Sequence, residues 1–164
     1  MDNKQSNKRI LGIDPGTGIL GFGIIDVTPK GKLIFVDAGV IRTPSEDTDS
    51  QRLMTIYTEL TEIINEHKPT IMSVEKLFFA QNVTTAMTVS QARGVVLLMG
   101  EQSKLELFEY TPLQIKQALT SYGRATKQQI QEMVKIILGL KENPKPDDCA
   151  DALAAAICHS MTMR

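Results

Sequence analysis

The chain has 164 residues, of which 42% are hydrophobic and 23% are charged, and its formal net charge at pH 7 is −1. This length and composition predict one globular domain over residues 1–164, whose residues 1–8 form a flexible polar extension. The polar N-terminus excludes a secretory signal peptide, and the longest apolar run, over residues 95–99, is too short to span a bilayer, so we expect a cytoplasmic protein without membrane contact.

Five strands are predicted from short apolar runs bounded by turn residues, over about residues 9–14, 20–27, 33–42, 70–75 and 105–110. Helices are predicted from apolar residues at helical spacing and from capping residues, over about residues 50–67, 82–103, 111–123 and 147–161, with another that begins at Thr126. This order predicts an α/β fold, in which a mixed five-stranded sheet has three antiparallel strands, two added parallel strands and helices on both faces. In such a sheet the ends of the first and fourth strands are neighbours.

Asp14 is the most informative residue of the chain. It ends the first apolar strand and is followed directly by Pro-Gly-Thr-Gly over residues 15–18. An Asp that caps a Pro-Gly turn is the simpler interpretation of this residue alone. A buried ionised carboxylate is costly, however, unless it is paired or binds a metal ion. Glu75 ends the fourth strand, so the predicted topology places a second carboxylate beside Asp14.

Asp148 and Asp151 add two acids on one face of the last helix, since they are three residues apart. Asp148 could simply cap this helix, as could Asp147, whereas Asp151 lies in an almost wholly apolar helix that should be buried. Four carboxylates without His or Cys suit Mg²⁺, for which Mn²⁺ substitutes, rather than zinc. Paired carboxylates of this kind fit phosphodiester hydrolysis with two metal ions.

Two stretches of the sequence, residues 76–100 and 110–131, contain no Asp or Glu. They contain several basic residues, of which the candidates for DNA contact are Arg93, Lys116, Arg124 and Lys127. Acid-free stretches can form a positive face on a weakly acidic protein. Solvated helix surfaces that happen to lack acids explain either stretch alone equally well.

Taken together, these residues resemble the RuvC family of bacterial Holliday junction resolvases, within the ribonuclease H-like nuclease superfamily. The similarity runs from about Ile10 to His159 and is carried by LGIDPGT (11–17) with GFG (21–23), VEKLF (74–78), QARG (91–94) and DCADALA (148–154). It implies a ribonuclease H-like sheet, with the catalytic and metal-binding acids at Asp14, Glu75, Asp148 and Asp151. It also implies Mg²⁺-dependent, paired symmetric nicking of four-way DNA junctions in recombination and repair.

The resemblance extends to partners and to DNA-contacting residues. It implies a homodimer that works beside the RuvA and RuvB branch-migration proteins, and the apolar residues of the predicted helix over 82–103 are numerous enough for both a core and an interface. It favours Phe78 over Phe79 as a residue that stacks on bases, and it gives Lys116 and Lys127 positions of basic residues used in DNA handling.

Two other functions fit parts of the sequence. The turn that begins at Asp14 is similar to the phosphate-binding loop of actin- and Hsp70-type ATPases, but those proteins need two lobes around the nucleotide and 164 residues are too few. A non-catalytic junction-binding protein of the same fold would gain nothing from acids that face phosphates. Cleavage of junction DNA that requires Mg²⁺ or Mn²⁺ would distinguish a nuclease from both.

Overall fold

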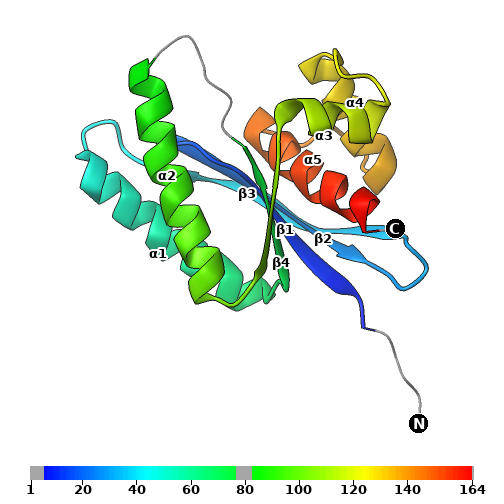
Figure 1. The fold of residues 1–164 in the computed structure, drawn as a ribbon, viewed down its shortest axis with the longest axis horizontal. Helices are drawn as coiled ribbons and strands as arrows, with labels where there is room; N and C mark the ends of the chain where they lie inside the picture. Colours follow the sequence, from blue (N-terminus) through cyan, green and yellow to red (C-terminus); the bar gives the residue numbers. More distant parts are fainter. Residues whose placement is uncertain (1–5, 77–82, 164) are drawn as a thin grey trace.

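The computed structural model describes residues 6–76 and 83–163, and its elements follow the predicted order (Figure 1). The strands are β1 (Lys8–Asp14), β2 (Ile19–Val27), β3 (Leu33–Arg42), β4 (Ile71–Glu75) and β5 (Glu106–Tyr110). The helices are α1 (Asp49–His67), α2 (Val83–Gln102), α3 (Pro112–Thr120), α4 (Lys127–Leu138) and α5 (Asp147–Thr162). Within the described ranges, no helix is long and apolar enough to cross a membrane.

The element boundaries differ from the predicted ones at two informative places. Lys8 is the first residue of β1 and pairs with Val27 of β2, so the flexible extension predicted over residues 1–8 wrongly includes a residue of the sheet. Residues 1–5 of that extension lie outside the described residues. The helix that begins after Thr111 ends at Thr120 rather than near Gly123, because Ser121 adopts a left-handed conformation with φ 59° and caps it. The helix start predicted at Thr126 is confirmed, since Thr126 is the N-cap of α4 and forms a capping box with Gln129.

The sheet has the strand order β3-β2-β1-β4-β5. β1 and β3 both pair with β2 in the antiparallel sense, whereas β4 pairs in parallel with β1 and with β5. The predicted mixed sheet is therefore confirmed. Ile13 of β1 lies opposite Val74 of β4, so Asp14 and Glu75, the next residue on each strand, leave the sheet at the same edge.

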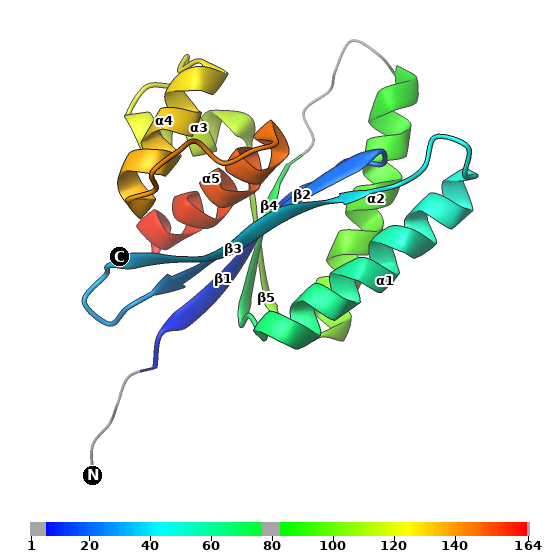
Figure 2. The ribbon, with the colours of Figure 1, turned by 180° about the vertical axis from the view of Figure 1, so that it is seen from behind.

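The two faces of the sheet are covered by different helices, as Figures 1 and 2 show: α1 and α2 lie on one side, and α3, α4 and α5 on the other. Alternation along β1 divides its side chains between them. Ile10 packs in the core under α3, α4 and α5, whereas Leu11 and Ile13 pack in the core with α1 and α2. Because side chains two residues apart point to the same face, Asp14 faces the α5 side together with Ile10.

The helix α5 lies unusually close to the strands beneath it, because those strands have glycines where other residues would collide with the helix. A Cβ on Gly12 would lie 2.9 Å from a backbone nitrogen of α5, and one on Gly21 would lie 2.7 Å from the carbonyl carbon of Asp148. Ser73 of β4 fastens the helix there, since its buried hydroxyl donates to the Ala155 carbonyl at 2.7 Å. Because Gly21 lies against Asp148, the start of α5 lies directly over the end of β1 and the start of β2.

The other end of α5 is anchored by its histidine. His159 is 3% exposed, its ring stacks on Phe108 with a centroid distance of 4.0 Å, and its Nδ1 lies 2.7 Å from the Tyr110 hydroxyl. Burial lowers the pKa of His159, which favours the neutral ring. The residue therefore has a structural role, and it fixes α5 to β5.

Candidate active site

Asp14 and Glu75 form the centre of the candidate site. Both carboxyl groups face α5 from neighbouring strands, and the Asp14 carboxyl donates a hydrogen bond to Glu75. Burial, followed by the charges of Glu75, Asp151 and Asp148, raises the pKa of Asp14 to about 8. Burial also raises the pKa of Glu75, although the hydrogen bond from Asp14 and the charges of nearby lysines oppose the shift. The surroundings of the pair therefore disfavour two negative charges on it.

The helix α5 brings the remaining acids to this pair. Its N-cap is Pro146 and no side chain caps the helix, so the capping interpretation of Asp147 and Asp148 does not hold. The negative charges of Asp151 and Asp148 both raise the pKa of Asp14. Asp147 instead has a side chain 59% exposed and does not contribute to the shift at Asp14. Of the two adjacent acids, Asp148 is therefore the one that the helix turns towards Asp14.

Two lysines complete the surroundings of the acids. The ammonium of Lys127 lies 3.1 Å from Asp151 Oδ2 and 3.7 Å from Asp147 Oδ2. Burial disfavours its charge, but the hydrogen bond and charge of Asp151 prevail and raise the pKa of Lys127. A pocket of about 270 Å³ opens beside the acids and is lined by Glu75, Asp151, Lys116 and Lys127, with apolar residues of α3 and α4. Residues 110–131 contain no acid, but α5 packs against them and brings its own acids next to their lysines.

The other predicted DNA-contacting residues lie elsewhere. Arg93 on α2 forms an ion pair with Glu109 on β5, which commits part of its guanidinium to joining these elements. Arg124 is exposed in the connection between α3 and α4. Phe78 and Phe79 lie outside the described residues. The structure thus brings Lys116 and Lys127 to the acids, but neither Arg93 nor Arg124.

The residues that seat α5, which are the glycines of β1 and β2 and Ser73, were not predicted from the sequence. A signal for them was present. Glycine inside a strand often marks a close approach by another backbone, and Gly12, Gly21 and Gly23 recur at alternate positions on paired strands. Ser73 is a polar residue inside an apolar strand, two positions before Glu75, and it is fully buried.

The chemistry of the acids fits a hard divalent cation. All the donors are carboxylate oxygens. Burial raises the pKa of both Asp14 and Glu75, and the charges of the neighbouring acids raise that of Asp14 further, so an added cation would offset the cost of ionising them. Across residues 6–76 and 83–163, no three acidic, His or Cys side chains lie close enough together to form a complete ligand set. The arrangement is therefore a close pair, Asp14 and Glu75, faced by Asp148 and Asp151.

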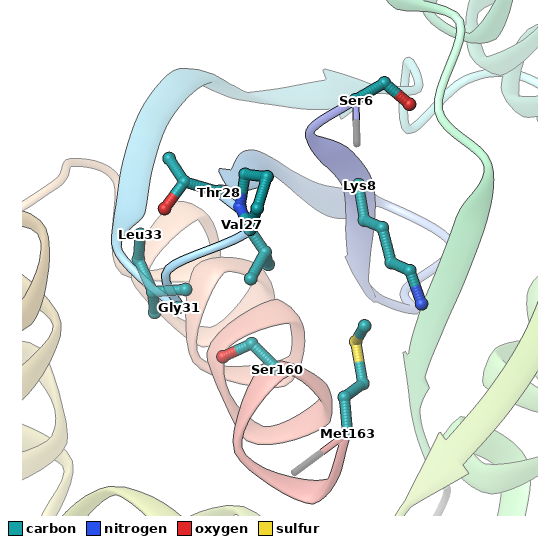
Figure 3. A pocket seen from close by; sticks show the side chains of 9 residues that line it. Ser6, Lys8, Val27, Thr28, Gly31, Leu33, Ser160 and Met163 are labelled. Carbon is teal, nitrogen blue, oxygen red and sulfur yellow. The ribbon is translucent and has the colours of Figure 1, made fainter. Parts of the chain in front are cut away.

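A second pocket, of about 310 Å³, is lined by residues of β1, of the β2–β3 connection and of the end of α5 (Figure 3). Its walls include Lys8 at the start of β1 and Ser160 near the end of α5, whereas Asp14 and Asp148 occupy the opposite ends of the same two elements. None of its lining residues is acidic. This pocket is slightly larger than the one beside Glu75, but it lacks the groups needed for hydrolysis.

Comparison with known proteins agrees with the geometry. The family model described as "Crossover junction endodeoxyribonuclease RuvC" matches residues 10–159. The protein of that name from Heliobacterium modesticaldum is 54% identical over 155 residues, which are 93% of this chain and 95% of the relative. The one from Desulfitobacterium hafniense is 56% identical over 152 residues, which are 92% of this chain and 91% of the relative.

Solved structures extend the comparison to the fold. Thermus thermophilus RuvC is similar with a TM-score of 0.88 at 35% identity, and its complex with a Holliday junction substrate with a TM-score of 0.86 at 33% identity, each covering 95% of both chains. The yeast mitochondrial Holliday junction resolvase Ydc2 shares the fold, with a TM-score of 0.71 at 15% identity over 94% of this chain and 78% of that one. The resemblance and the fold inferred from the sequence are confirmed: the chain belongs to the RuvC family of crossover junction endodeoxyribonucleases.

Proposed function

We propose that this chain resolves four-way DNA junctions by metal-dependent phosphodiester hydrolysis, making paired symmetric nicks during recombination and repair. The observation that supports this most directly is the close pair of Asp14 and Glu75, on β1 and β4, which the acids of α5 face beside an open pocket with two lysines. Family membership supports the substrate, since a relative of known structure is described in complex with a Holliday junction. Action on DNA is consistent with the cytoplasm as its location.

Asp14, Glu75, Asp148 and Asp151 would hold two Mg²⁺ ions, for which Mn²⁺ would substitute. When bound, such ions supply an activated water and stabilise the leaving oxygen of an in-line displacement. The chain's own contribution is to hold the carboxylates in place from a rigid sheet and a closely seated helix. Burial of the Asp14–Glu75 pair keeps it poorly hydrated, which strengthens its interaction with a cation.

Lys116 and Lys127 would contact the DNA beside these acids. Both line the pocket next to Glu75, so they can neutralise a phosphate placed against the acids. Arg124 is exposed beyond them and would contact the DNA backbone farther from the reacting phosphate. We also assign DNA contacts to Arg93 and Phe78. Arg93 is the basic residue of α2, and Phe78 is assigned by family resemblance.

A homodimer would supply the second active site that paired nicks require, because a C₂ dimer matches the symmetry of a junction. The helix α2 offers a surface for it. Val83, Met87 and Leu98 are 72%, 62% and 61% exposed, and together with Gly94, which has open space around it, they form one narrow stripe along the helix. Val96 and Met99 point the other way into the core. By family resemblance, RuvA and RuvB would be further partners.

The test compares a synthetic four-way junction with a linear duplex of the same sequence, with Mg²⁺, with Mn²⁺ and with a chelator. The proposal predicts two symmetric nicks in the junction when either metal is present, and none with the chelator. Asp14→Asn and Glu75→Gln keep the side-chain shapes and should abolish cleavage while junction binding persists. Near-normal cleavage by either variant would overturn the site, and nucleotide hydrolysis without DNA cleavage would support the ATPase interpretation.

A further inference from the structure

The turn that follows Asp14, residues 15–18, is tied to the protein on two sides. On the side of β3, the Thr43 hydroxyl donates to the Thr17 carbonyl at 2.6 Å, and the Thr43 N–H donates to the Gly18 carbonyl at 3.0 Å. On the other side, the Thr17 hydroxyl donates to the carbonyl of Thr88 in α2 at 2.8 Å. The turn therefore bridges the end of β3 and the interior of α2.

The Thr17 side chain is placed for this bond rather than for contact with solvent or a ligand. Thr17 is 7% exposed, and its hydroxyl is directed into α2, on the opposite face of the sheet from α5. A hydroxyl that is buried and satisfied in this way holds two backbone segments at a defined separation. It also differs from the phosphate-binding threonine expected of an ATPase loop, since it is not presented to a nucleotide.

We propose that Thr17 is a positioning residue for DNA cleavage, whose hydroxyl links the turn after Asp14 to α2 and so sets the place of the Asp14 carboxylate relative to Glu75. This inference rests on the proposed nuclease function. Glu75 is the last residue of β4, but the chain stays bonded to β5 beyond it, since Glu75 pairs with Tyr110 and the N–H of Lys76 donates to the Tyr110 carbonyl at 2.7 Å. Asp14 is the last residue of β1 and pairs with Gly21 of β2, whereas its register with β4 ends one residue earlier, at Ile13, so the turn that follows is a second constraint on where its carboxylate lies.

The bond from Thr17 reaches α2 next to the exposed side of that helix. Thr88 follows Met87, one of the exposed residues of the apolar stripe proposed for dimer contact. One side of this helical turn therefore faces the surface while its backbone accepts the bond from Thr17. A shift of α2 on docking of a second copy would reach Asp14 through the Thr17 hydroxyl.

The test uses the full chain with four substitutions. Thr17→Val replaces the hydroxyl with a methyl group of similar size. Thr17→Ala removes the hydroxyl and the methyl group of threonine, and Thr17→Ser keeps the hydroxyl. Thr43→Val is the matched control, because it also removes a buried hydroxyl bond to this turn but leaves the Thr43 N–H bonded to Gly18. Melting temperature, Mn²⁺ binding by calorimetry without DNA, junction binding with a chelator, and single-turnover cleavage are measured for each.

Thr17→Val should weaken Mn²⁺ binding by about tenfold, as losses of groups that orient metal ligands do. It should slow single-turnover cleavage by roughly 10- to 100-fold, the effect of a displacement near 1 Å, while junction binding stays unchanged. Thr17→Ser should restore both properties. Thr43→Val should lower the melting temperature as much as Thr17→Val does, yet keep metal binding and cleavage.

The inference is overturned if Thr17→Val behaves like the wild type, if Thr43→Val loses metal binding and cleavage equally, or if Thr17→Ser is as impaired as Thr17→Val. Should Thr17→Val not fold, the comparison of Thr17→Ala with Thr17→Ser decides in the same way. A wild-type chain that binds Mn²⁺ but leaves junctions intact would refute the proposed function, and the calorimetry would still test the role of Thr17 in holding Asp14.

Discussion

Gly21→Ala is the substitution that best separates the position of α5 from the chemistry of its acids. Gly21 pairs with Asp14 on the neighbouring strand and lies beneath the backbone of Asp148. A Cβ added to Gly21 would lie 2.7 Å from the Asp148 carbonyl carbon and nearer still to the oxygen, whereas ordinary contact begins at 3.4 Å. The start of α5 must therefore move by at least 0.7 Å, carrying Asp148 away from Asp14.

The cost to stability should be moderate and the cost to cleavage large. Overpacking of this kind typically costs about 1–3 kcal/mol. A domain that starts with about 5 kcal/mol would keep about 2 kcal/mol, at which roughly 97% of the chains are folded. Unfolding would then remove only a few per cent of the activity. A displacement close to 1 Å at a reacting centre, in contrast, can cost roughly 100-fold in rate.

The assay is single-turnover cleavage of a four-way junction at saturating enzyme and Mg²⁺, with urea unfolding of the same preparations. Gly18→Ala is the matched control, because it adds the same methyl group close to the site at a position with nothing within 4 Å. Gly21→Ala should cleave far more slowly than Gly18→Ala although both remain folded. Equal rates for the two variants would show that α5 can yield without moving its acids, and would refute the reasoning.

Four further expectations follow from the site and its surroundings. Without divalent ions, the free energy of unfolding should fall as pH rises from 3.8 towards about 8, because folded Asp14 keeps a proton that the unfolded carboxyl loses near 3.8; urea titrations of Asp14→Asn should lack most of this slope. Lys127→Ala should flatten the dependence of log junction affinity on log salt by about one unit and also slow cleavage, whereas Arg124→Ala should affect binding alone; unchanged salt slopes would exclude phosphate contacts. Leu98→Asp should yield a monomer in sedimentation at concentrations where the wild type is a dimer, and a persistent dimer would move the interface off α2. Phe78→Ala should impair junction processing far more than thermal stability, since base–aromatic stacking is worth about 1–3 kcal/mol, and a large fall in melting temperature with normal activity would assign Phe78 to the core.

The sequence by itself determined the elements and the central acid pair, because the signals for them are local. Alternating and periodic apolar residues define the strands and helices, and the capping residues Thr111 and Thr126 place two helix starts. The position of Asp14 and Glu75 at strand ends follows once the strand order is inferred, since parallel neighbours end at one edge. Motif order was sufficient for the family, because the motifs lie along nearly the whole chain.

Only the tertiary structure decided which charges meet. Lys127 lies in an acid-free stretch of sequence, but α4 packs against α5 and brings it within 3.1 Å of Asp151. Asp147 and Asp148 are adjacent and chemically identical, and the rotation of α5 over Gly21 alone turns Asp148 towards Asp14. Such pairings depend on how closely a helix approaches a sheet and on its rotation, which are set by contacts between distant segments and leave no periodic pattern in the residues themselves.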